Sequence, residues 1–144
     1  MTLPVRAEPT HEAEVMALGL ALTDRTQAAE LVDLVEERDF QTFRGRLIFQ
    51  ALRRAVDDGR EPDVVTVHQL LREAGVEEDA GGLDHLAELM DFGAGPGTVA
   101  GHAETLRRAR QRRHVATALR GAQDDLEAGG DAREIVGRLD GGVG

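Results

Sequence analysis

Apolar residues recur three and four positions apart in one short segment after another, and this helical period constrains the fold more than any other feature of the sequence. The chain has four Phe and neither Trp nor Tyr, so its core must consist mainly of Leu, Val and Ala, of which Ala and Leu are strong helix formers. We therefore predict an all-α protein, with a compact globule of five to six helices followed by a helical hairpin. The globule's helices are expected near residues 10–22, 26–35, 44–58, 66–75 and 83–90.

Residues that cap helices support this division. Thr10 and Thr66 stand where the first and fourth helices should begin, and Asp24 with Gln27 forms a capping-box pattern at the start of the second helix. In the fifth helix we expect Leu83, Leu86, Leu89 and Met90 to form one inward apolar face, because they recur at the helical period.

The stretch 91–101, DFGAGPGTVAG, has four Gly and one Pro in eleven residues and precedes a run of arginines. A phosphate-binding loop would need a preceding strand and a Lys on the phosphates, but this stretch follows a predicted helix and the chain has no Lys. We interpret it as a joint in which Phe92 is the last anchor of the globule, residues 93–97 break the chain, and Thr98 caps the next helix.

A long polar helix is predicted from about residue 99 to 128, and after a Gly-Gly turn Asp131 can cap a short last helix that carries Ile135, Val136 and Leu139. We divide the chain into a globular subdomain, residues 1–97, and a helical hairpin, residues 98–144, whose second arm is short and whose glycine-rich end we expect to fray. The long helix has apolar residues spaced +4, +3 and +4, which is typical of a helix–helix seam. These are Val115, Leu119, Ala122 and Leu126.

Several functional classes find no support in the sequence. The chain has no Cys and no Ser, which excludes disulfides, thiolate metal sites and serine or cysteine nucleophiles. Its five His form no local metal-binding pair, and its adjacent carboxylates point in different directions on a helix, so neither group predicts a metal site or an acid–base pair. No apolar run is long enough for a membrane span and no signal peptide is evident, so we expect a cytoplasmic protein. Because no metal-binding or phosphate-binding pattern is found, we also expect no cofactor.

Charge is distributed unevenly along the chain. Residues 1–101 carry 20 acidic residues against 9 Arg, whereas residues 102–144 carry 7 against 8. An acidic globule repels phosphates, so direct DNA binding is disfavoured except through the arginine run. That run has three interpretations: a solvated helix face, a contact with an acidic protein partner, or a nucleic-acid contact without base stacking, since no aromatic residue interleaves it. The residues expected to contact an acidic partner or nucleic acid are Arg107, Arg108, Arg112 and Arg113.

Six short motifs follow one another in a distinctive order. They are Pro9 with Glu12-Ala13-Glu14 and Ala17-Leu18-Gly19; Asp39-Phe40; Arg46-Leu47-Ile48-Phe49; Pro62-Asp63 through Thr66-Val67; Gly81-Gly82 with Leu86 and Leu89; and Pro96 with His102-Ala103 before the arginines. In this order and spacing, over most of residues 8–136, the chain resembles the N-terminal domain of the replicative DnaB-type helicases. It departs from that family in having Gly45 in place of His and His102 in place of Tyr, and in a connection about two residues shorter.

The resemblance implies a non-catalytic interaction and oligomerisation module. In the family this domain pairs through its hairpins, helps to form the hexamer's collar and docks the primase, whereas the RecA-like ATPase domain lies beyond the resemblance. The implied partners are a second copy of the chain, a primase, a helicase loader or a full-length replicative helicase. The residues expected to mediate self-association are Leu106, Arg110, Val115, Ala116, Leu119, Ala122 and Leu126. The alternative is a small DNA-associated regulator that binds through residues 107–113.

Overall fold

A computed structural model describes residues 9–95 and 97–142, and across these residues it contains seven α-helices, one 3-10 turn and no strand. The all-α prediction is therefore confirmed. The helices form two units, Met1–Arg107 and Arg108–Gly144. Pro96, which the sequence assigns to the joint, and Val143 and Gly144, which belong to the tail expected to fray, lie outside the described residues.

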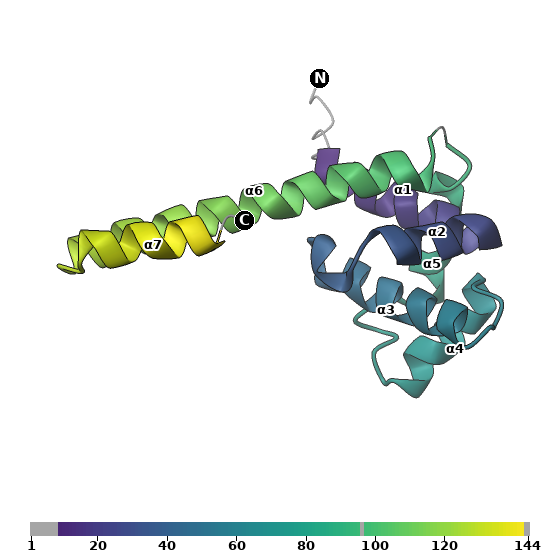
Figure 1. The fold of residues 1–144 in the computed structure, drawn as a ribbon. Coiled ribbons are helices and arrows are strands. Elements are labelled where there is room, and N and C mark those ends of the chain that lie inside the picture. Colours follow the sequence, from purple (N-terminus) through teal and green to yellow (C-terminus); the bar gives the residue numbers. More distant parts are fainter. Residues whose placement is uncertain (1–8, 96, 143–144) are drawn as a thin grey trace, which may run out of the picture. The chain divides into compact units, whose positions relative to one another are not determined.

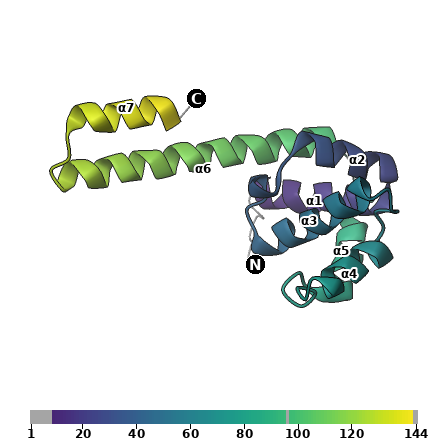
Figure 2. The ribbon, with the colours of Figure 1, turned by 60° about the horizontal axis from the view of Figure 1, so that its bottom comes forward.

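The first unit is built around its first helix, which packs against three others in the views of Figures 1 and 2. This helix contacts the second, third and fifth helices, while the fourth helix lies between the third and the fifth. The elements are α1 (Pro9–Thr23), α2 (Arg25–Leu34), the 3-10 turn η1 (Glu37–Asp39), α3 (Phe43–Asp57), α4 (Val64–Glu73), α5 (Gly82–Phe92) and the beginning of α6 (Val99–Glu127).

The cap predicted for α2 is present, whereas three other capping predictions are wrong. Thr10 lies inside α1, which already includes Pro9, so it does not cap that helix. The Asp24 carboxylate accepts hydrogen bonds from the N–H groups of Thr26 and Gln27, which confirms the start of α2. Gln27 does not complete a capping box, because its side-chain oxygen accepts instead from the N–H of Val99 at 3.2 Å and holds the start of α6 against α2. Thr66 does not cap α4, because Asp63 does so by accepting from the Thr66 N–H at 2.9 Å.

The glycines at the crossing of α1 and α5 let the two backbones approach closely. A Cβ atom on Gly19 would lie 2.1 Å from the Leu89 carbonyl oxygen, and one on Gly93 would lie 2.4 Å from the Gly19 carbonyl oxygen. Any side chain at either position would force the helices apart. The glycine of the first motif is therefore explained by helix packing.

A buried carboxylate ties α1 to the start of α3. Glu14 is almost fully buried, and its oxygens accept hydrogen bonds from the N–H groups of Gln41 and Thr42 and from the Thr42 hydroxyl. The same hydroxyl caps α3 by accepting from the N–H of Gly45. A Cβ atom on Gly45 would lie 2.8 Å from the Glu14 carboxylate, so the glycine leaves room for this network.

The core of the first unit uses only part of the apolar face predicted for α5. Leu86 and Leu89 are fully buried, but Leu83 and Met90 are 49% and 38% exposed, which corrects their assignment to the core. Phe92 is 43% exposed and is therefore not an anchor of the globule. The apolar face of α5 is wider than the surface that the other helices cover, and part of it remains in solvent.

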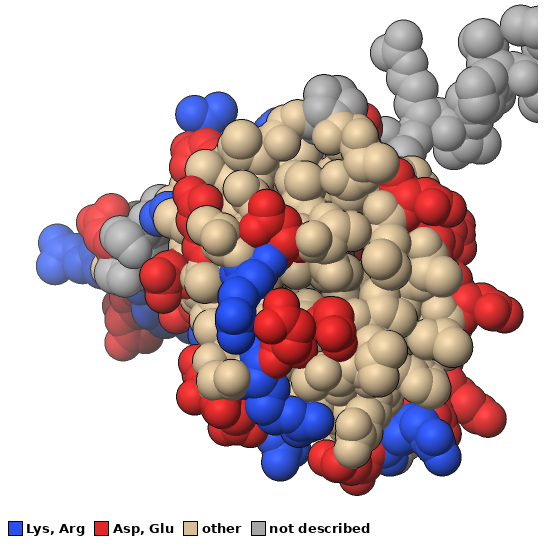
Figure 3. Space-filling model, turned by 90° about the vertical axis from the view of Figure 1, so that its right-hand side faces the viewer, with Lys and Arg blue, Asp and Glu red and all other residues tan. Residues whose placement is uncertain are grey.

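The surface of the first unit is predominantly acidic, as its composition predicts. Figure 3 shows one face of this unit, on which a continuous area of uncharged residues is bordered by acidic side chains. Arginine side chains form a row at one side of the same view. A surface of this charge is poorly suited to general contact with phosphates.

The second unit is a helical hairpin formed by the later part of α6 and by α7 (Ala132–Gly142). The two helices lie side by side and antiparallel in both ribbon views. Gly129 has a φ of 86°, a left-handed conformation that suits glycine at the end of a helix, and the Asp131 carboxylate accepts from the Arg133 N–H to begin α7. The predicted hairpin with a short second arm is therefore present.

Candidate functional site

The described residues offer no obvious catalytic or metal-binding constellation. No group of three or more His, Asp or Glu residues in this part of the chain is placed to hold a metal ion. Among the described helices, none combines the length and the apolar character needed to cross a membrane. The strongest candidate for function is therefore the surface of the hairpin.

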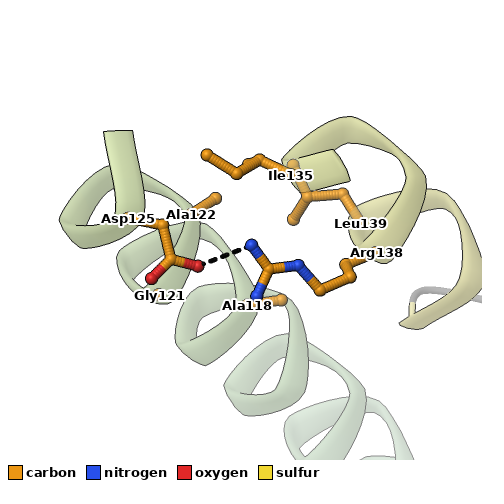
Figure 4. A pocket seen from close by; sticks show the side chains of 7 residues that line it. All are labelled: Ala118, Gly121, Ala122, Asp125, Ile135, Arg138 and Leu139. Carbon is orange, nitrogen blue, oxygen red and sulfur yellow. Dashed lines mark ion pairs between the residues drawn. The ribbon is translucent and has the colours of Figure 1, made fainter. Parts of the chain in front are cut away.

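The inner face of the hairpin is small, and Figure 4 shows the side chains of α6 and α7 that line it. Ile135 of α7 is 3% exposed and packs toward Ala118 and Ala122 of α6, and Arg138 forms an ion pair with Asp125 at 2.9 Å. The cavity between the helices has a volume of about 150 Å³, well below the roughly 300 Å³ of typical small-molecule sites. This face therefore joins the two arms rather than holding a cofactor.

A second apolar face of the hairpin points away from this inner seam. Leu119 and Leu126 are 55% and 53% exposed, and because they are seven residues apart on α6 they share one face. Val136 is 55% exposed on α7 and follows the buried Ile135 by about 100° of helical rotation.

The direction of the two helices places these side chains together. Leu119 and Val136 each follow an inward-facing residue, Ala118 and Ile135 respectively, by about 100°. Because the helices are antiparallel, the same rotation carries both side chains toward the same side of the hairpin. We call this surface the outer hairpin face. It consists of Val115, Leu119, Leu126 and Val136.

Three residues of the predicted self-association set lie elsewhere. Ala122 lines the inner seam of the hairpin. Leu106 is fully buried in the core of the first unit together with Val99 and Ala103, so the first turns of α6 belong to the globule rather than to a free seam. Arg110 precedes Leu119 by nine residues, which places it about 180° around α6 from the outer hairpin face. Ala116 is exposed and lies beside the face.

The arginines of residues 107–113 do not form a single basic surface. Arg107, Arg108 and Arg112 are exposed, while Arg110 and Arg113 are half-buried. Because successive residues rotate by about 100°, these five side chains are distributed around the whole circumference of α6. A helix that tracks a nucleic-acid backbone needs its cations on one side, so the arrangement does not favour the DNA-binding alternative.

Val136 is the residue of the outer hairpin face that sequence reasoning missed. The sequence predicts that the last helix carries Ile135, Val136 and Leu139 without assigning them to faces, and two consecutive residues of a helix cannot face the same neighbour. Only Ile135 and Leu139 line the seam with α6. The consecutive Ile-Val pair is therefore a sequence signal for a helix with apolar contacts on two sides.

Comparisons with known proteins agree with this architecture. The family described as "DnaB-like helicase N terminal domain" matches residues 7–108. The chain is 34% identical over 83 residues to the replicative DNA helicase DnaB of Pasteurella multocida, covering 56% of this chain and 18% of that protein. It is 27% identical over 122 residues to the corresponding protein of Buchnera aphidicola subsp. Baizongia pistaciae, covering 85% of this chain and 26% of that protein.

A solved structure supports the fold over nearly the whole chain. The crystal structure of the N-terminal domain of DnaB helicase from Mycobacterium tuberculosis superposes with a TM-score of 0.83, with 21% sequence identity. The superposition covers 92% of this chain and 94% of that one. The chain spans only about a fifth of the length of the first curated relatives that it matches.

Proposed function

Because the chain belongs to the DnaB-like helicase N-terminal domain family, we propose that it is a non-catalytic module of DNA replication that self-associates through the outer hairpin face. We further propose that it docks a primase, a helicase loader or a full-length replicative helicase in the cytoplasm. The ATPase activity of the whole helicases belongs to parts of those proteins that this chain does not match, so we assign no catalytic step to it.

The observation that carries the proposal is the exposure of three large apolar side chains on one face of the hairpin. Leu119, Leu126 and Val136 each expose more than half of their surface although the hairpin already has a buried seam. On α6, Val115, Leu119 and Leu126 have a heptad-like spacing, which matches the packing of a further helix. A second hairpin, with the same face, is the simplest partner for such a surface, because a two-fold contact is self-complementary.

Charge also favours contact between hairpins over contact between globules. Residues 102–144 carry 7 acidic residues and 8 Arg, so two hairpins meet without strong net repulsion. Residues 1–101 carry 20 acidic residues and 9 Arg, so two globular surfaces of this composition repel each other. The hairpin is therefore the part of the chain that is electrostatically suited to pair with its own copy.

Light scattering coupled to size-exclusion chromatography tests self-association directly. Over a concentration series that reaches the high micromolar range, we expect the mass to rise to about twice the 15.5 kDa of the chain or more. A mass that stays at that of one chain over the whole series would refute the self-association half of the proposal. Titration calorimetry with purified primase and loader proteins then tests the docking half.

A further inference from the structure

A second apolar surface lies on α5, in the first unit. Leu83 and Met90 are seven residues apart and Ala87 lies between them on the same face of the helix, so the three form one continuous stripe in solvent. The buried leucines of α5, Leu86 and Leu89, lie on the adjoining side of the helix, which the other helices of the unit cover. We call Leu83, Ala87 and Met90 the α5 stripe.

An acidic row runs along one edge of this stripe. Asp84, Glu88 and Asp91 each follow a member of the stripe by one residue, which places them about 100° around the helix from it. All three are exposed. The Glu88 carboxylate lies 3.8 Å from the His85 imidazole, whereas Asp84 and Asp91 form no ion pair with another residue in the described part of the chain. We call these three residues the acidic edge. An apolar stripe beside uncompensated negative charge is suited to a partner that supplies both apolar and cationic groups.

We propose that the α5 stripe and the acidic edge together dock an amphipathic helix of another protein, whose apolar residues are flanked on one side by Arg or Lys. The inference deepens the partner-docking half of the proposed function, because it assigns that role to a surface separate from the outer hairpin face. The Cα positions from Leu83 to Asp91 span roughly 12 Å along the helix, so they accommodate about two to three turns of a partner helix. Ala87, in the middle of the stripe, allows that helix to approach closely.

The same charges argue against other occupants. Nucleic acid is repelled by the acidic edge, since its phosphates carry the same sign of charge. A second copy that docked its own α5 across a two-fold axis would bring acidic edge close to acidic edge in a unit that is already strongly negative. A basic amphipathic helix has the opposite charge and a matching apolar stripe, so it satisfies both features.

Fluorescence anisotropy with synthetic helical peptides tests the proposal on the full chain. The probe is a labelled peptide with Leu at i, i+4 and i+7 and Arg beside each Leu, and the comparison peptide has Glu in place of every Arg. We expect the Arg peptide to bind at least about tenfold more tightly at low salt, with the difference shrinking as salt is raised. Equal binding of the two peptides would overturn the proposal.

Matched variants separate this surface from general attraction to an acidic protein. Leu83→Ser with Met90→Ser should weaken binding of the Arg peptide by at least about tenfold, whereas Val65→Ser, which alters a 73% exposed residue of α4, should change it less than about twofold. Neutralising the acidic edge with Asn and Gln should remove most of the salt dependence. Equal losses in the stripe variant and the Val65 variant would contradict the assignment.

Light scattering on the same variants distinguishes a failure here from a failure of the proposed function. The stripe variant should keep the mass of the wild-type chain, because the outer hairpin face is unchanged. A drop in mass would mean that a second copy covers the α5 stripe, and the proposed partner would then be wrong. An unchanged mass with unchanged peptide binding would reject the docking surface while leaving self-association intact.

Discussion

Replacing Leu119 and Leu126 by Ser tests whether the outer hairpin face holds two copies together. The two side chains are 55% and 53% exposed in the single chain, so about half of each is still available for burial. Complete burial of a Leu side chain is worth about 2 kcal/mol, and the remaining half is therefore worth about 1 kcal/mol. A symmetric pair buries two such residues from each copy, which amounts to about 4 kcal/mol of association free energy.

Ordering of side chains at the interface offsets part of this gain, so the double variant should weaken dimerisation by at least about a hundredfold. Sedimentation equilibrium or light scattering over a dilution series measures the change. The free energy of unfolding of the monomer should stay within about 0.5 kcal/mol, because both residues lie outside the buried seam. Circular dichroism during urea denaturation checks that the helices remain intact.

Val65→Ser is the matched control, since it removes an exposed apolar side chain from the first unit and leaves the hairpin untouched. It should dimerise as the wild-type chain does. If the double variant and this control have the same dissociation constant as the wild type, the exposed leucines do not mediate association. The reasoning from exposure and helical spacing would then be refuted.

Three further predictions concern stability, all measured by urea denaturation. Gly19→Ala should lower the free energy of unfolding by about 3 kcal/mol, because its Cβ would lie 2.1 Å from the Leu89 carbonyl oxygen. Gly121→Ala is the control: its Cβ meets no atom within 4 Å, so this variant should gain up to about 1 kcal/mol from helix propensity. Equal effects of the two variants would contradict the close crossing of α1 and α5. Glu14→Ala should cost about 3 kcal/mol, because it leaves buried N–H and hydroxyl donors unpaired, and a loss under about 1 kcal/mol would refute that role. Burial, and to a smaller extent the nearby Arg44 guanidinium, lowers the pKa of His85 from its ordinary value of 6.5. As the pH falls through that value, His85 is protonated in the unfolded chain before it is protonated in the folded chain, so the free energy of unfolding decreases. His85→Asn should make the urea midpoint less dependent on pH between about pH 7 and 5, and an unchanged dependence would contradict the assignment.

Local sequence determined where most helices begin and end. Asp24 and Asp131 lie next to the N–H groups that they cap, and Thr98 accepts from the N–H of Gly101 as its position predicts. Caps of this kind depend on atoms only two or three residues apart, so they can be deduced from sequence. The miss at Thr66 has the same origin, because Asp63 is an equally local acceptor three residues earlier.

Tertiary structure alone decided which apolar residues remain exposed. Periodicity identifies an apolar face, but it does not say how wide a surface the neighbouring helices will cover, which is why Leu83 and Met90 were expected inside and lie outside. Leu106 shows the reverse case, since it resembles a seam residue of the hairpin and is buried in the globule.

The sequence by itself determined the helical class, the order of the elements and the membership of the family, because these follow from local propensity and from motifs in a fixed order. The tertiary structure decided the two candidate docking surfaces, the outer hairpin face and the α5 stripe. Exposure depends on which helix packs against which, and that arrangement is set by contacts between residues far apart in the chain, such as Gly19 with Gly93 and Gln27 with Val99.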